Sequence, residues 1–326
     1  MRSITVKAND AGQRLDKFLT KAVKGLPMSL LYKFIRLKKI KVNRKRAEAN
    51  QVLAVGDEIQ LFIKDEFFDV PEKDTGALDA IRPKLDIVYE DDHILLLNKR
   101  PGVLVHEDEG GGENTLILHV QAYLHQKGQY DPRDEASFAP ALCNRIDRNT
   151  GGIVIAAKTA AALREMNEKI REDEIRKFYL CLAHGRMPKR QDTLHGWLRK
   201  DSKNNLVRVE DHPFPGAKEI VTAYRVLKEI PSKTEPGGVD SLLEVELITG
   251  RTHQIRAHLS FIGHPLIGDG KYGINRADRE KGYKYQCLYS YRLVFRFKNT
   301  DGTIGYLKGK EVRIEPEDIW FVREIL

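Results

Sequence analysis

The chain has 326 residues, of which 41% are hydrophobic, and this is enough for two domains with apolar cores. It contains no apolar run of 18 residues, which excludes a membrane-spanning helix, and its first residues lack the apolar stretch of a secretory signal. Cys143, Cys181 and Cys287 are isolated and have no Cys-x-x-Cys spacing. They predict reduced thiols of a cytoplasmic protein, and neither a metal site nor a disulfide framework.

The net charge of +8 is concentrated at one end of the chain. Residues 1–64 contain 15 Lys plus Arg against 5 Asp plus Glu, a net charge of +10, whereas the remainder carries −2. A compact basic segment attached to a nearly neutral body predicts a module that binds a polyanion.

That basic segment has a readable order of elements. Apolar residues recur at helical spacing in residues 14–19 and again in residues 31–35, the second run being opened by Ser29 as a candidate cap. Strand-like stretches follow at residues 40–43 and 58–63. The order resembles the small RNA-binding domain named after the fourth small-subunit ribosomal protein, here predicted over residues 12–64. The candidate RNA-binding residues are Arg14, Lys33, Arg36, Lys39, Arg44 and Lys45. The alternative is a solvated basic helix pair.

Residues 65–84 contain Pro71, Gly76 and Pro83 with little periodicity, and they predict a linker. The rest of the chain, residues 85–326, is predicted as one larger domain. Its clearest elements are a helix over residues 159–171, a strand over 175–183 and a short helix over 252–262.

The most informative stretch runs from Asn144 to Gly152 and places Asp147 between Arg145 and Arg148. Flanking cations favour the ionised carboxylate, so this side chain is available as a nucleophile or base at neutral pH. The following Thr-Gly-Gly provides a tight turn into an apolar strand. Taken alone, the same pattern also fits a surface ion-pair cluster.

This stretch resembles the signature of the RluA-type family of pseudouridine synthases, with Asn144 where the family often has His. Five further segments, in the order of the family, are similar to its other motifs: residues 98–106, 175–183, 249–256, 268–273 and 288–293. The resemblance implies an α+β fold, with a largely antiparallel mixed sheet and with flanking helices and loops around a central cleft.

The resemblance also implies the chemistry. Asp147 would be the catalytic carboxylate, Arg251 would pair with it, and Tyr179 would stack on the uracil, while Arg145 and Lys177 would contact RNA. No metal and no cofactor are required. The implied partner is RNA, with large-subunit ribosomal RNA favoured over transfer RNA, and the competing hypothesis is a non-catalytic RNA-binding or ribosome-assembly protein. The oligomeric state stays open.

Other features of the chain have competing interpretations. His253, His258 and His264 suggest a metal cluster, but neighbouring arginines would repel a cation. Residues 197–203 fit a basic arm that touches RNA phosphates or a solvated hairpin tip. Tyr272 fits either a site residue or a packed turn.

Overall fold

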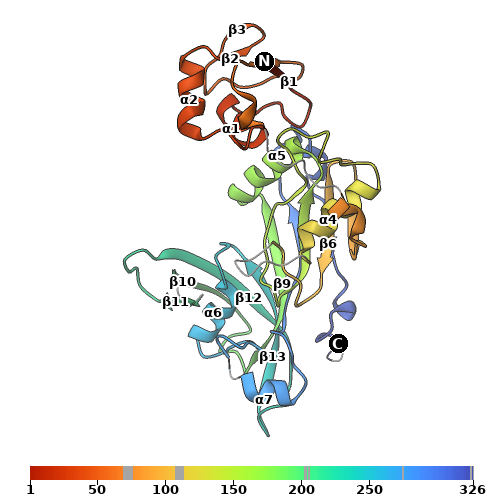
Figure 1. The fold of residues 1–326 in the computed structure, drawn as a ribbon. Helices are drawn as coiled ribbons and strands as arrows, with labels where there is room; N and C mark the ends of the chain where they lie inside the picture. The colour runs from red at the N-terminus through yellow and green to blue at the C-terminus, as the bar shows by residue number, and fades with distance from the viewer. Residues whose placement is uncertain are drawn as a thin grey trace.

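The computed structural model describes residues 1–68, 76–106, 114–201, 204, 206–273, 275–323 and 325. Figure 1 shows a small amino-terminal module, drawn in red, beside a larger body built around one long sheet. No helix of the described segments is long and apolar enough to cross a membrane.

The module is a four-stranded sheet in the order β1-β4-β2-β3 with two helices. The elements are β1 (Arg2–Thr5), α1 (Leu15–Ala22), α2 (Met28–Arg36), β2 (Ile40–Val42), β3 (Lys45–Arg46) and β4 (Glu58–Leu61). Leu15, Phe18 and Leu31 are buried between the helices and the sheet, as the helical spacing predicts. Two details differ. Strand β1 precedes the predicted boundary at residue 12, and α2 begins at Met28 after Pro27, so Ser29 lies inside the helix and does not cap it.

The predicted linker is not a bare connection where the structure describes it. It contains the short 3-10 helix η1 (Asp65–Phe67) and α3 (Gly76–Ala80), while residues 69–75 lie outside the described part of the chain. Phe67 packs against the core of the module, and Leu78 is buried in the larger body. The segment is therefore anchored at both ends.

The larger body is an eleven-stranded mixed sheet in the order β11-β10-β12-β13-β9-β14-β8-β6-β5, with β15 paired to β14 and β7 to β8. Its strands are β5 (Ile87–Glu90), β6 (Ile94–Lys99), β7 (Ala141–Leu142), β8 (Gly151–Ala157), β9 (Ile175–His184), β10 (Gln191–Asp201), β11 (Leu206–Glu210), β12 (Lys218–Pro231), β13 (Val239–Leu247), β14 (Leu288–Phe295) and β15 (Glu311–Arg313). Of the strand pairs, β8 with β14 is parallel and the others are antiparallel. The predicted α+β class with a largely antiparallel mixed sheet is confirmed.

Besides α3, the helices that the structure describes along this sheet are α4 (Leu116–Gln126), α5 (Ala160–Arg171), α6 (Gln254–Phe261) and α7 (Asn275–Glu280). The 3-10 helices η2 (Gly305–Leu307) and η3 (Pro316–Asp318) follow near the carboxyl end. Helix α5 begins where its sequence predicts, because the Thr159 hydroxyl accepts a hydrogen bond from the Ala162 N–H and caps it.

Alternation along β9 divides the sheet into two faces. Phe178 and Leu180 point into the largest apolar cluster, and we call their side the back face. Tyr179 and Cys181 point the other way, towards α6, and define the front face. A second cluster, between α4 and β6, lies on the same front face, because Val154 and Ala156 of β8 belong to it while Ile153 and Ile155 belong to the largest cluster.

The module docks on the larger body through polar side chains that follow β1. Asn9 Oδ1 accepts a hydrogen bond from the Ala160 N–H at 3.1 Å, so it adds a cap to α5 from the other domain. Fully buried Asp10 accepts both the N–H and the hydroxyl of Ser137, and Gln13 donates to the same hydroxyl. Figure 1 shows the module over the start of α5.

Candidate active site

Asp147 lies in a turn just before β8, on the front face. Its carbonyl accepts the Thr150 N–H at 3.0 Å, and the chain then enters the strand through Gly152. At Gly152 φ is +116°, and a Cβ there would lie 2.1 Å from the Ser290 carbonyl oxygen, so the residue must be glycine. Asn144, which departs from the family pattern, accepts the Ile155 N–H at 2.7 Å and fastens the start of the turn to β8.

A buried lysine supports this turn from below. Lys99 is 1% exposed, and its ammonium donates to the carbonyls of Arg100, Val103 and Arg148 at 3.1, 2.9 and 2.8 Å. Three acceptors match the three protons of the ammonium. Burial lowers the pKa of Lys99 to about 7, although the nearby Asp147 carboxylate opposes the shift. The sequence did not single out Lys99, although this residue belongs to the family-like segment 98–106.

The arginine that contacts Asp147 is Arg256, so the predicted pairing with Arg251 is wrong. Arg256 Nη1 lies 2.7 Å from Asp147 Oδ2. Its Nε and Nη2 form a two-pronged contact with Asp269, which is fully buried. One guanidinium therefore holds two carboxylates at once, in a geometry that lysine cannot reproduce.

The hydrogen bonds at the start of α6 explain why Arg256, and not Arg251, contacts Asp147. The Gln254 side-chain oxygen accepts the Arg251 N–H at 3.1 Å, and its amide nitrogen donates to the Val221 carbonyl at 3.1 Å. This fixes Arg251 in the exposed turn before the helix, while Arg256 lies within α6 and is buried. Burial alone would lower the pKa of Arg256, but Asp269 and Asp147 outweigh it and raise that pKa.

Asp269 belongs to the family-like motif at residues 268–273 and acts through Arg256. Burial alone would raise the pKa of Asp269, but the bond to Arg256 and the N–H groups of Lys271 and Tyr272 lower it. This carboxylate therefore stays ionised and keeps the guanidinium aimed at Asp147.

Tyr179 lies on β9 on the same face and is 6% exposed. Burial raises the pKa of Tyr179 to about 12, and the charge of Asp147 adds to the effect. The phenol is thus protonated at neutral pH. It can donate a hydrogen bond to a base, but it is not a proton acceptor in that range.

His253 and Tyr272 complete the surroundings of Asp147. His253 Nε2 lies 3.9 Å from Asp147 Oδ2, and His253 Nδ1 lies 2.8 Å from the Tyr272 hydroxyl. Of the two interpretations of Tyr272, the structure supports the site residue. His258 bonds to the Thr222 hydroxyl and His264 to the His184 carbonyl, so the three histidines of residues 253–264 face different partners.

The predicted RNA-contacting residues fall into different settings. Arg145 is exposed next to Asp147, whereas Lys177 is half-buried with its ammonium near Gly250, and burial lowers the pKa of Lys177. Arg14 is bound to Asp16 within the module at 2.7 Å. The remaining candidates are exposed and form no ion pair with any described residue: Lys33, Arg36, Lys39, Arg44 and Lys45.

The predicted basic arm is the end of the β10–β11 hairpin. Residues 197–201 belong to β10, and Ser202 and Lys203 lie outside the described segments. Arg199 and Arg208 are both exposed and stack over the ring of Phe214 at 5.4 and 5.5 Å. The hairpin packs against α6 and so borders the site.

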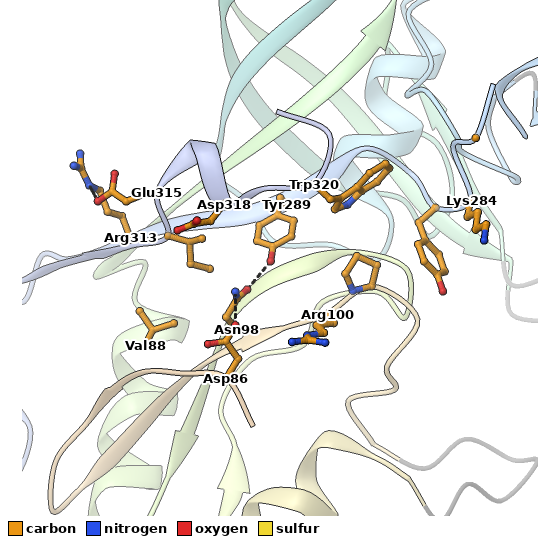
Figure 2. Close-up of a pocket in the computed structure, with 14 residues that line it drawn as sticks. Asp86, Val88, Asn98, Arg100, Lys284, Tyr289, Arg313, Glu315, Asp318 and Trp320 are labelled. Atoms are coloured by element: carbon orange, nitrogen blue, oxygen red, sulfur yellow. Dashed lines mark hydrogen bonds and ion pairs between the residues drawn. The ribbon is translucent and has the colours of Figure 1, made fainter. Parts of the chain in front are cut away.

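A cavity of about 810 Å³ lies elsewhere, on the back face. Figure 2 shows Asn98 and Tyr289 at its centre, where the Tyr289 hydroxyl donates to Asn98 and Asn98 donates to Asp86. Lys99, the neighbour of Asn98, points to the front instead. The volume of this cavity therefore says nothing about the chemistry at Asp147.

Comparisons with known proteins agree with these residues. The family model described as RNA pseudouridylate synthase matches residues 93–261, and that of the S4 domain matches residues 13–59. An uncharacterised RNA pseudouridine synthase of Mycoplasma genitalium is 34% identical over 89% of this chain and 88% of its own length. The ribosomal large subunit pseudouridine synthase C of Escherichia coli (strain K12) is 32% identical over 97% of this chain and 92% of its own.

A solved structure supports the fold. Human RNA pseudouridylate synthase domain containing 1 superposes with a TM-score of 0.55 at 23% identity, over 72% of this chain and 84% of that one. The two family models match consecutive parts of the chain, and the relatives align along most of its length. This chain therefore belongs to the RNA pseudouridylate synthase family and carries an amino-terminal S4 domain.

Proposed function

We propose that this protein isomerises uridine to pseudouridine in large-subunit ribosomal RNA, with Asp147 as the catalytic residue. The observation that carries the proposal is the Asp147 carboxylate, held at one oxygen by buried Arg256 within the family's motif. The choice of ribosomal RNA rests on relatives named ribosomal large subunit pseudouridine synthase C, which are 32–34% identical to this chain. With that substrate, the protein would act in the cytoplasm.

The reaction breaks the bond between uracil N1 and ribose C1′ and forms one between C5 and C1′. The proton on C5 must leave, and N1 must gain one. Asp147 Oδ2 is engaged by Arg256, and no described residue forms a hydrogen bond with Oδ1. Oδ1 is therefore the oxygen available to react, whether it attacks C1′, attacks the uracil ring or assists elimination.

Tyr179 supplies an aromatic wall and a protonated hydroxyl on the same face. The detached uracil must rotate without escaping, and a ring that stacks on it favours this motion over release. We therefore assign Tyr179 to holding the base and donating a hydrogen bond to it.

The S4 module would supply affinity. Lys33, Arg36, Lys39, Arg44 and Lys45 are exposed on it, and such side chains bind phosphates with release of counterions. Taking the target uridine out of its stack costs a few kcal/mol, and these phosphate contacts would offset part of that cost. Arg145 is exposed two residues before Asp147 in the chain, and it would contact a phosphate near the target.

The test compares Asp147→Asn with the wild-type protein. The variant keeps the size of the side chain but removes the reactive anion, so we expect no release of tritium from RNA labelled at uracil C5 and little change in RNA affinity by filter binding. Large-subunit ribosomal RNA and transfer RNA transcripts are assayed in parallel. Turnover by the variant would overturn the role of Asp147, and modification of transfer RNA alone would overturn the choice of substrate.

A further inference from the structure

We propose that His253 is a positioning residue that donates a hydrogen bond from its Nε2–H to Asp147, in a ring form selected by Tyr272. The inference rests on the proposed role of Asp147 and adds to it a second donor beside Arg256. It also links Asp147 to the β10–β11 hairpin, because the line of hydrogen bonds begins at the backbone of β11.

The Tyr272 hydroxyl fixes one end of the imidazole. Its oxygen accepts the Val207 N–H at 3.0 Å, and His253 Nδ1 lies 2.8 Å away. The structure places no other acceptor for the hydroxyl proton among the described residues. The hydroxyl therefore donates to Nδ1, and a neutral imidazole that accepts at Nδ1 carries its proton on Nε2.

The carboxylate at the other end selects the same form. Nε2 lies 3.9 Å from Asp147 Oδ2, so an N–H at that position is attracted to the anion, while a lone pair would be repelled. The His253 side chain is 8% exposed. Burial lowers the pKa of His253 to about 4 against the opposing effect of Asp147, which keeps the ring neutral.

The backbone at His253 is consistent with an enforced ring position. The residue has φ 54° and ψ 18°, a left-handed conformation that residues other than glycine seldom adopt, at the position just before α6. Its ring meets that of Tyr272 edge to face at 5.6 Å. A separation of 3.9 Å from the carboxylate is long for a hydrogen bond, and such contacts shorten when substrate closes the site.

The β10–β11 hairpin, where this line of hydrogen bonds begins, also carries exposed cations that could bind RNA. Val207 lies in β11, whose partner strand carries exposed Arg199 and Lys200, and Arg208 follows Val207 directly. RNA bound to these cations would lie on the strand whose Val207 N–H orients Tyr272, and through Tyr272 the His253 ring.

The first experiment uses His253→Gln and His253→Asn as a matched pair. The glutamine amide nitrogen reaches the place of Nε2, whereas the asparagine amide reaches only that of Nδ1. Asparagine also tolerates the left-handed backbone, so His253→Asn should fold. Single-turnover rates on ribosomal RNA are measured at neutral pH, after circular dichroism has verified that both variants are folded.

We expect His253→Asn to lower the rate roughly ten- to a hundredfold, the loss of one hydrogen bond to a charged group. His253→Gln should recover most of the rate, because its amide nitrogen restores the donor. An undiminished rate in His253→Asn, or no recovery by glutamine, would overturn the proposal.

The second experiment reads the ring form without substrate. Protein labelled with 15N-histidine should show His253 protonated at Nε2 only, assigned by the signal missing in His253→Gln. Tyr272→Phe should produce a mixture of the two ring forms. Protonation at Nδ1 in the wild type would refute the proposal even in an active enzyme. Conversely, a protein inactive on every RNA would remove the proposed function and leave this measurement valid.

Discussion

Asp147 owes its direction to an arginine that it shares with a second acid. Arg256 is 6% exposed at its side chain and contacts both Asp147 and Asp269. Removing one partner from a buried ion pair leaves an uncompensated charge and costs about 3–5 kcal/mol. Because one guanidinium contacts both carboxylates, even a substitution of Arg256 that keeps the positive charge should disturb the position of Asp147.

A first prediction compares Arg256→Lys with Arg251→Lys. A lysine at 256 cannot span Asp147 and Asp269, so the single-turnover rate should fall roughly a hundredfold or more. Arg251 is exposed in the turn before α6, and the same exchange there should leave the rate near that of the wild type. A strong loss at 251 with little loss at 256 would restore the pairing that the sequence predicts.

A second prediction concerns Lys99→Met. The variant keeps most of the buried stem but leaves the carbonyls of Arg100, Val103 and Arg148 without their donor. Unpaired buried acceptors cost about 1–3 kcal/mol each, so the free energy of unfolding in urea should fall by several kcal/mol. Lys24→Met, at an exposed lysine of the module, is the control and should unfold like the wild type.

The positions of the candidate site residues were predictable where the motif is contiguous. Asp147 and Tyr179 follow from short stretches of sequence, and both lie on the front face. The choice between Arg251 and Arg256 does not, because both belong to residues 249–256 and only the hydrogen bonds of Gln254 decide where the helix begins. The importance of His253 depends on Val207 and Tyr272, which are distant in the chain.

At the scale of elements, α7 is held to the site by a charged histidine. His184 lies 3.1 Å from Asp278 in α7 and 3.6 Å from Asp240 in β13. Asp278 also accepts the Gly268 N–H at 2.7 Å, in the turn that carries Asp269. The contacts with Asp240 and Asp278 raise the pKa of His184 to about 9.

This anchor predicts a pH dependence of stability. Because the folded-state pKa lies above the unfolded value of about 6.5, the contribution is complete below that pH and is lost as the pH rises through about 9. We expect the melting temperature of the wild type to fall between pH 7 and 10 relative to that of His184→Gln. Parallel curves for the two proteins across this range would refute the anchor.

A further prediction concerns the turn into β8. Gly152→Ala would place a Cβ against the Ser290 backbone and should prevent the β8–β14 pairing, which would give insoluble or inactive protein. Gly56 also has a positive φ, but an added Cβ would meet nothing within 4 Å. Gly56→Ala should therefore cost only about 1 kcal/mol and stay active. Equal yields and activities would show that the close approach is not required.

The helices and strands were predictable where the spacing of neighbouring residues determines them, and not where distant pairing does. The helix of α5 and the alternation of β9 follow from spacing and are confirmed. Strand β1 was missed, because its residues are mostly exposed and its position depends on pairing with β4, more than fifty residues later. The parallel pairing of β8 with β14 likewise depends on distant residues and on Gly152, so the periodicity of the sequence does not predict it.

At the scale of the whole molecule, a polar interface joins the module to the larger body. Asp10 is fully buried there and receives both hydrogen bonds of Ser137. We predict that Asp10→Ala increases hydrogen exchange at the start of α5 and in residues 131–138, while the core of each domain stays protected. Asp65→Ala, which removes an exposed ion pair inside the module, serves as the control. Unchanged exchange in Asp10→Ala would mean that the docking does not depend on this acid.

The cap that Asn9 places on α5 couples the stability of this helix to that of the module. A ligand that binds only the docked, folded state stabilises everything coupled to it. RNA held by the module alone would then raise the melting temperature of the catalytic body, even when no uridine reaches Asp147. For the same reason, an S4 module transplanted from a relative would need matching partners at Ser137 and Ala160, and a chimera without them would bind RNA but lose that communication.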